Sequence, residues 1–132
     1  MGNTSTLKLF FNNSIMDSQA SCNKVFPVER IVPKTEAPGE KAIELLLEGA
    51  ISSAEAEKGY ATSINYGVKL NKLTIENDTA KIDFDEQLEF QVGGSCRVSA
   101  IRAQITETLK QFLSVKNVII SINGRIEDIL QP

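Results

Sequence analysis

Apolar residues in this chain follow two periods, one of about two residues and one of three to four. The stretch Thr6 to Phe11 is rich in strand-forming residues and predicts a first strand. The stretch Val25 to Lys34 alternates only in part and carries two prolines, which predicts an edge strand or an irregular strand. Near the end of the chain, Val118 to Ile122 predicts a buried strand that is followed by an Asn123–Gly124 turn.

The clearest hairpin in the sequence lies between Val68 and Asp85. Its first strand has one irregularity near Asn71, and Asn77–Asp78 is a typical turn pair. On the return strand, the alternating residues that we expect to face the core are Ala80, Ile82 and Phe84.

Helical periodicity occurs in two long stretches and one short one. The segment APGEKAIELLLEGA, residues 37–50, predicts a helix that ends at Gly49. A short helix follows, with Ser52 or Ser53 as its N-cap. The longest predicted helix runs from Ser95 to about Phe112, and Ser95 is its expected N-cap. Its core-facing stripe consists of Val98, Ile101, Ile105, Leu109 and Phe112.

This order of strands and helices predicts an α+β fold. We expect a two-layer α/β sandwich, in which two main helices pack on one face of a mixed sheet of about five strands. The longest helix can serve as the crossover between two parallel strands. Residues 1–6 are polar, and we expect them to form a flexible segment before a single domain of residues 7–132.

Composition narrows the classes of function. The chain has 132 residues, enough for one core, and a net charge of −3 with acidic and basic residues interspersed, which argues against a nucleic-acid partner. It contains no histidine, the usual general base near neutral pH and the commonest metal ligand. Two cysteines without histidine are too few for a tetrahedral zinc site. We therefore expect no metal and no cofactor.

Cys96 lies at the predicted start of the longest helix, beside Arg97. A helix N-terminus and a neighbouring cation both lower the pKa of a thiol, so a nucleophile is physically reasonable, but no histidine can act as its base. The alternatives are an inert buried thiol or a disulfide with Cys22, which lies near the end of a polar loop. An extracytoplasmic location would favour the disulfide.

Two further groups resemble binding sites, and each has a simpler interpretation. The glycines of GGSCR, residues 93–97, could offer backbone N–H groups to an anion, but no phosphate-binding or dinucleotide-binding motif is present. The acidic residues Asp83, Asp85 and Glu86 lack calcium-loop spacing and indicate a solvated strand face. Arg102 is expected to pack its stem at the core edge and to pair its head with a carboxylate.

Both tyrosines of the chain, Tyr60 and Tyr66, lie in the predicted loop KGYATSINYG. Exposed tyrosines favour protein contacts, which makes this loop a candidate interaction site. The alternative is that one or both rings cover the core.

In these segments the chain resembles the GerMN domain, the sporulation and spore germination domain, over nearly everything from Leu7 to Pro132. The matching segments are VFPVERIVPKT (25–35), AIELLLEG (42–49), GYATSINYGVKLNKLTIENDTAKIDFD (59–85), GGSCRVSAIRAQITETLKQF (93–112) and VIISINGR (118–125). The segments SCNKVFPV and GGSCRV look like those of family members that carry both cysteines, although many members lack them.

The resemblance implies a two-layer α/β fold similar to ring-building motifs of secretion assemblies. It also implies an exported protein or lipoprotein of the bacterial cell envelope, linked to sporulation, germination or envelope signalling, with no catalytic residue to carry over. The start MGNTSTLKLFF shows no signal peptide or lipobox cysteine, so we expect membrane attachment only through an anchor outside this chain.

Our leading hypothesis from the sequence is a non-enzymatic extracytoplasmic interaction module. It would bind another envelope protein, or itself, through a sheet edge or the Tyr60–Tyr66 loop. The alternative is a domain that binds a cell-wall glycan or peptide in a cleft with converging polar groups. An enzyme is the hypothesis that we favour least.

Overall fold

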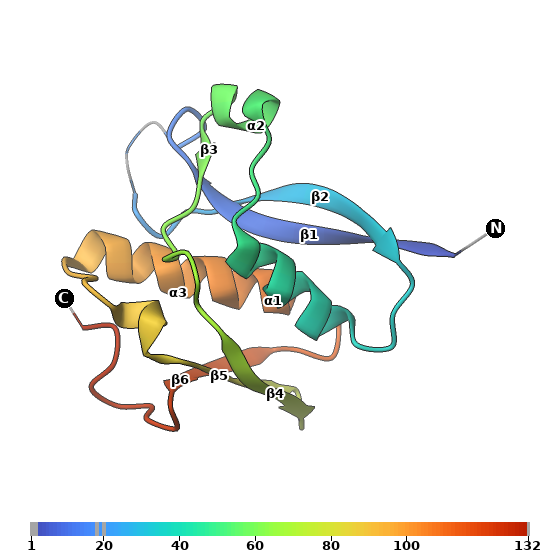
Figure 1. Cartoon of the computed structure of the whole chain (residues 1–132), viewed down its shortest axis with the longest axis vertical. Coiled ribbons are helices and arrows are strands. Elements are labelled where there is room, and N and C mark those ends of the chain that lie inside the picture. Colours follow the sequence, from blue (N-terminus) through green and yellow to red (C-terminus); the bar gives the residue numbers. More distant parts are fainter. Residues whose placement is uncertain (1–2, 18, 20, 132) are drawn as a thin grey trace.

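The computed structural model of the chain describes residues 3–17, 19 and 21–131. Its elements, in chain order, are β1 (Thr4–Asn13), β2 (Phe26–Pro33), α1 (Pro38–Glu48), α2 (Ser53–Glu57), β3 (Tyr60–Ala61), β4 (Leu70–Glu76), β5 (Thr79–Phe84), a 3₁₀ turn (Glu86–Glu89), α3 (Ser95–Lys110) and β6 (Asn117–Ile122) (Figure 1).

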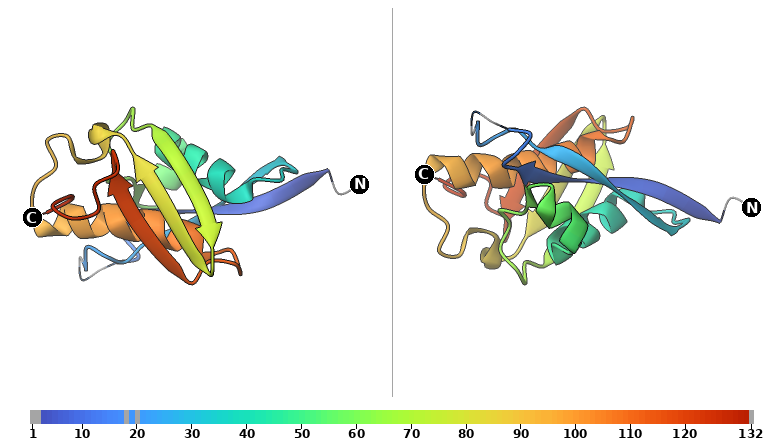
Figure 2. Two further views of the ribbon diagram at one scale, coloured as in Figure 1. Left: turned by 90° about the horizontal axis from the view of Figure 1, so that it is seen from below. Right: turned by 90° about the horizontal axis from the view of Figure 1, so that it is seen from above.

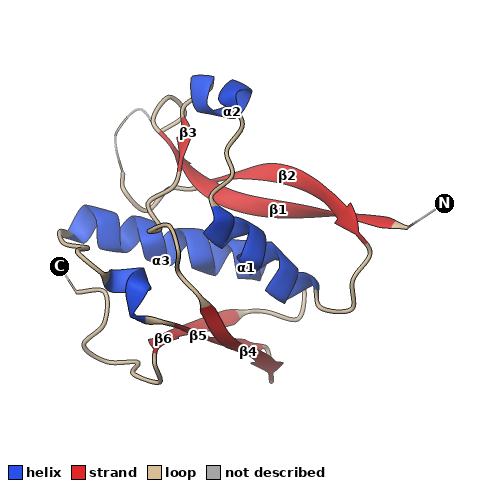
Figure 3. Ribbon diagram, in the orientation of Figure 1, coloured by secondary structure: helices blue, strands red, loops and turns tan. Residues whose placement is uncertain are grey.

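In the described residues the strands form two sheets of three strands each, and α1 and α3 lie between them (Figures 1 and 3). One sheet has the order β2-β1-β3 and is antiparallel; the other has the order β4-β5-β6, with β6 parallel to β5. In Figure 2 the view from below has β4, β5 and β6 in front of the helices, and the view from above has β1 and β2 in front of α3.

The α+β class is therefore right, but the expected single mixed sheet with both helices on one face is wrong. Alternation identifies the buried face of each strand, but it carries no information on which strands share a sheet. The helices are instead covered on two sides. Of the predicted stripe, α3 buries Val98, Ile101, Ile105 and Leu109, whereas Phe112 lies beyond the end of the helix and is half-buried. The helix also buries Ala100, Gln104 and Thr108, which widens its buried arc.

One hydrophobic core joins the two sheets and the helices. The largest side chains at its centre, each less than 2% exposed, include Phe11 of β1, Ile43 of α1, Phe84 of β5 and Ile105 of α3. Complete burial of such a side chain stabilises the fold by roughly 1.5–3 kcal/mol. Because these residues come from both sheets and both helices, the core holds the three layers together.

The hairpin prediction is confirmed in detail. β4 and β5 pair antiparallel, and the register shifts between Leu70 and Lys72, at the predicted irregularity. Asn77 and Asp78 have φ values of 50° and 64°, the left-handed conformation that a tight hairpin turn requires. Ala80, Ile82 and Phe84 are buried as expected.

The crossover prediction is also confirmed, since β6 pairs parallel to β5 after the chain has passed through α3. α1 ends as predicted at Gly49, whose φ of 61° is left-handed. Of the two serines that the sequence offered as the N-cap of α2, the structure uses Ser52, and Glu55 completes a capping box.

Part of the N-terminal segment that we predicted to be flexible, residues 1–6, is a strand in the structure. Residues 1 and 2 lie outside the described residues. Thr4, Ser5 and Thr6 already belong to β1, because they pair with the end of β2. Within the described ranges, the helices are all too short or too polar to cross a membrane.

Candidate functional site

The start of α3 differs in one respect from the prediction. Gly94, not Ser95, is the N-cap residue, and because glycine has no side chain, the helix start has no side-chain capping bond. Its φ of 87° suits glycine, and its carbonyl accepts the first helical hydrogen bond from the N–H of Val98 at 3.2 Å. Ser95 is therefore the first residue of the helix proper.

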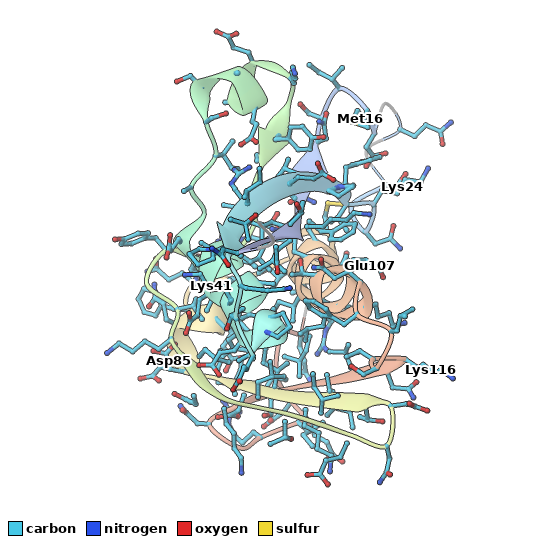
Figure 4. All side chains as sticks on the ribbon, turned by 90° about the vertical axis from the view of Figure 1, so that its right-hand side faces the viewer. Met16, Lys24, Lys41, Asp85, Glu107 and Lys116 are labelled. Atoms are coloured by element: carbon cyan, nitrogen blue, oxygen red, sulfur yellow. A yellow bond between two sulfur atoms is a disulfide. The ribbon has the colours of Figure 1, made fainter. Side chains whose placement is uncertain are left out.

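Cys96 forms a disulfide with Cys22 in the structure, across a sequence separation of 74 residues and a Cα–Cα distance of 5.0 Å. Figure 4 shows this bond in yellow, close to the segment that carries Lys24. A sulfur held in a disulfide is not a thiolate, so Cys96 in this state is not the nucleophile that the sequence allowed. The bond ties the loop after β1 to the first turn of α3.

A hollow of about 690 Å³ lies beside the disulfide. Four segments meet there: the end of β1, the turn after it, the chain around β3, and the first turn of α3. The polar side chains that line it come from Asn12, Asn13, Ser14, Asp17, Thr62, Ser63 and Arg97.

Arg97 forms hydrogen bonds with the backbone and with one side chain of the neighbouring loop. Its Nε donates to the carbonyl oxygen of Ser63 at 3.2 Å, and its Nη2 donates to Oδ1 of Asn65. Arg97 therefore orders the chain between β3 and β4.

Arg102 does not pair with a carboxylate as predicted. Its Nη2 instead donates to the carbonyl oxygen of Ile129, at 3.1 Å. The C-terminal segment passes over α3 at this point, so a backbone carbonyl is the nearer acceptor.

The acidic residues at the end of β5 and just after it bind parts of the protein itself. Oδ1 of Asp83 accepts hydrogen bonds from the hydroxyl of Ser121 at 2.6 Å and from the N–H of Gly124 at 2.8 Å, and Oδ2 accepts one from Asn71 at 3.0 Å. Burial raises the pKa of Asp83, but these three bonds outweigh burial, so its pKa lies below the ordinary value.

Asp85 and Glu86 take part in the same local network. Asp85 accepts from the N–H groups of Lys69 and Gln87, and Glu86 accepts from the side chain of Asn123. Within the part of the chain that the structure describes, three or more metal-ligating His, Cys, Asp or Glu side chains do not come together.

The two tyrosines differ in their surroundings. Tyr60, in β3, packs against the core, and its hydroxyl donates to the carbonyl oxygen of Pro27 at 3.4 Å. Tyr66 is 85% exposed. Tyr60 therefore covers the core, which was the alternative interpretation of this loop, whereas Tyr66 faces solvent.

Two polar residues that sequence reasoning missed hold this region together. Asn65 donates to the carbonyl oxygens of Gln87 and Phe90, both at 2.8 Å, and accepts from Arg97. Gln104 is fully buried and bonds Ser63, Thr62 and Phe10. Gln104 adjoins the apolar stripe of α3, and that position could have indicated a buried polar residue; nothing in the sequence around Asn65 does so.

The fold is similar to three solved structures. The tandem GerMN domains of the sporulation protein GerM from Bacillus subtilis match at 22% identity and a TM-score of 0.70, over 93% of this chain and 40% of that one. The first GerMN domain of GerM matches at 20% identity and a TM-score of 0.64, over 92% and 85%. A protein from Clostridium perfringens, described as a candidate lipoprotein, matches at 21% identity and a TM-score of 0.57, over 93% and 77%.

These likenesses show the fold, and the chain spans 40% of the length of the tandem structure. A comparison with curated protein sequences gave no match. The model of the Germane family, described as sporulation and spore germination, matches residues 8–128. Because this match takes in nearly the whole chain, the protein belongs to the Germane family of sporulation and spore germination domains.

Proposed function

We propose that this domain is a non-enzymatic protein-interaction module of the bacterial cell envelope that acts outside the cytoplasm. Membership of the sporulation and spore germination family supports a role in an envelope process. The likeness to a candidate lipoprotein of Clostridium perfringens supports the location. So does the disulfide, because such bonds persist mainly in oxidising compartments.

The observation that carries the proposal is the display of Tyr66 on an ordered frame. The ring is 85% exposed, yet Ile64 and Val68 on either side are only 6% and 7% exposed. The carbonyl oxygen of Tyr66 accepts from Nε2 of Gln87 at 3.0 Å. A large aromatic ring on a fixed backbone loses little conformational entropy when a partner covers it, which is typical of residues that dominate protein interfaces.

The edge of β2 is less suited to adding a strand from a partner. In the ladder, the backbone N–H and C=O groups of the even-numbered residues of β2 point to β1. The N–H groups of the odd-numbered residues therefore point to the free edge. Pro27 and Pro33 lack those donors, and Nη1 of Arg30 occupies the carbonyl oxygen of Glu29 at 2.9 Å. We therefore propose Tyr66, rather than this edge, as the contact point.

A photo-crosslinking amino acid at position 66 tests the proposal in the envelope of the native bacterium. Ile31, which is 75% exposed on β2, provides the matched control position. We expect light-dependent adducts with another envelope protein, or with a second copy of the chain, from position 66 and not from position 31. Equal adducts from both positions, or none from position 66, would contradict the proposal.

The hollow beside the disulfide favours a second candidate function, the binding of a cell-wall glycan or peptide. Polar side chains from three segments, including Asn12, Ser63 and Arg97, meet in it. Titration of the chain with soluble peptidoglycan fragments, followed by NMR, should then shift the amide signals of Gly93 and Gly94. Unchanged signals at saturating fragment concentrations would rule this candidate out.

A further inference from the structure

A groove lies between α1 and the segment that carries Tyr66, and its volume is about 500 Å³. Val68 is buried, and together with the half-buried side chains of Leu47 and Leu70 it makes part of the lining apolar. The exposed ring of Tyr66 forms one wall. The groove therefore offers an apolar surface beside an aromatic side chain, the composition of an interface centre.

The wall on the side of α1 is negatively charged. Glu44 and Glu48 are both exposed, and they lie one turn apart on the same face of the helix. The last turn of α1 has no basic residue, although the negative end of the helix dipole would favour one. Among the described residues, the ion pairs of the chain involve neither Glu44 nor Glu48.

The cation that also lines the groove is Lys69, and it faces other carboxylates as well. Its positive charge acts on Glu86, whose pKa it helps to lower, while its backbone N–H donates separately to Oδ1 of Asp85 at 3.2 Å. In Figure 4, Lys41 of α1 lies on the same side of the molecule as Asp85, opposite Lys24, Glu107 and Lys116. Because the ion pairs among the described residues leave out Glu44 and Glu48, the two exposed carboxylates at the end of α1 can receive a cation from a partner.

We propose that this groove binds a short segment of a partner protein in which an apolar side chain lies next to a lysine or arginine. The apolar side chain would pack on Leu47, Val68 and Leu70 and against the ring of Tyr66. The cation would lie between Glu44 and Glu48, at the negative end of the helix dipole. This inference rests on the proposed function and adds the chemistry of the partner.

The charge of the groove explains why the occupant should be basic. Glu44 and Glu48, one turn apart on an exposed helix face, repel each other. A bound cation attracts both carboxylates and so offsets this repulsion. An acidic segment would add to it, so the same charges discriminate against the wrong partner.

A random dodecapeptide library displayed on phage and selected against the full chain, with its disulfide intact, tests the inference. We expect the selected peptides to be enriched in lysine or arginine next to apolar residues. For a synthetic copy of one such peptide, we expect the Kd measured by fluorescence anisotropy to rise about tenfold or more in Tyr66→Ala and in the double variant Glu44→Gln, Glu48→Gln.

The matched control is the double variant Glu57→Gln, Glu107→Gln, which removes the same charge from exposed positions of α2 and α3. We expect its Kd to stay within about twofold of the wild-type value, since distant surface charges are screened. Selection of no peptide, of peptides without basic residues, or of peptides whose affinity ignores Glu44 and Glu48 would overturn the inference.

Sedimentation of the chain alone tests whether the groove instead binds a second copy of the chain. A wild-type dimer that dissociates in Tyr66→Ala would assign the groove to a second copy and would also overturn the inference. Crosslinking at position 66 reports whether Tyr66 lies in a protein contact, whatever the charge of the partner. Failure of the charge inference and failure of the proposed function can therefore be told apart.

Discussion

Gln104 shows, at the scale of one residue, why a fully buried polar side chain is retained in this core. β3 covers only the last two residues of β1, so the N–H and C=O groups of Lys8 and Phe10 on that edge have no strand partner. Polar side chains of α3 and of the residue after it bind them instead: Gln104 donates to the carbonyl of Phe10, Thr108 accepts from its N–H, and Gln111 bonds both groups of Lys8. The helix therefore completes the edge of the sheet.

Replacement of Gln104 by leucine should destabilise the fold by about 2–4 kcal/mol. Leucine has a similar size but would leave the N–H of Ser63 and the carbonyl of Phe10 buried without a partner. Urea denaturation of wild type and variant measures the change. Glu107→Gln, exposed on the same helix, is the control and should stay within about 0.5 kcal/mol of wild type. An equal effect of the two substitutions would contradict this account.

At the scale of an element, α2 is too short to be stable alone, and the structure holds it in place from both sides. Ser52 and Glu55 form the capping box at its start. Arg30 of β2 then binds Glu55 with two parallel hydrogen bonds, at 2.8 and 2.7 Å, and its Nη2 also donates to the carbonyl oxygen of Ala50. The ion pair thus fixes a five-residue helix against the β2-β1-β3 sheet.

This ion pair should make part of the stability dependent on pH. The hydrogen bonds from Arg30 lower the pKa of Glu55 from 4.5 to about 2. Because the folded pKa is below the unfolded one, the contribution is fully present above pH 4.5 and disappears as the pH falls towards about 2. Glu55→Gln should cost about 1 kcal/mol at neutral pH, since the pair is partly exposed, and should flatten the loss of stability over that interval.

Unfolding free energies from urea titrations at a series of pH values test this prediction. Glu57→Gln, exposed in the same helix, is the control and should keep the slope of the wild type. The idea fails if wild type and Glu55→Gln lose stability in parallel between pH 4.5 and about 2.

At the scale of the whole molecule, the disulfide closes a loop that contains most of the fold. The sequence separation between Cys22 and Cys96 is 74, and the chain between them includes α1, α2 and the four strands β2 to β5. A cross-link of this span mainly restricts the unfolded chain, because it removes many extended conformations. The bond also lines the hollow described above, since both cysteines belong to its wall.

Removal of the disulfide should cost about 4 kcal/mol in the chain-entropy account. The double variant Cys22→Ser, Cys96→Ser should unfold at a lower urea concentration than the oxidised wild type. Reduced wild type should unfold close to the variant, which controls for effects of the serines. A variant as stable as the oxidised wild type would show that the cross-link contributes little.

Thiol titration of denatured, unreduced protein from an oxidising compartment should find no free cysteine.

Much of the local structure could be predicted from the sequence, because local rules govern it. Alternation located Ala80, Ile82 and Phe84 on the buried face of β5, and turn chemistry located Asn77–Asp78. The N-cap of α3 could not be predicted in this way, because either Ser95 or Gly94 fits the composition of a helix start, and the backbone angle decides between them.

The candidate site was predictable in part. Tyr60 and Tyr66 come from one loop and have the same chemistry, so nothing local distinguishes the ring that packs on the core from the ring that faces solvent. The groove beside Tyr66 could not be predicted either, since Leu47 and Glu48 approach Leu70 only after α1 has docked. Such contacts join residues that are distant along the chain.

The sequence by itself determined the α+β class, the order of the main helices and strands and the faces they bury, because periodicity and turn residues act within a few positions. It also carries the family membership, through the match of residues 8–128 as a whole. The tertiary structure alone decided that the strands form two sheets with the helices between them, and that α3 completes the edge of β1. It also decided that Tyr66 lies beside Glu44 and Glu48. These outcomes depend on which buried faces meet, and pairing between distant segments is set by the packing of the whole core.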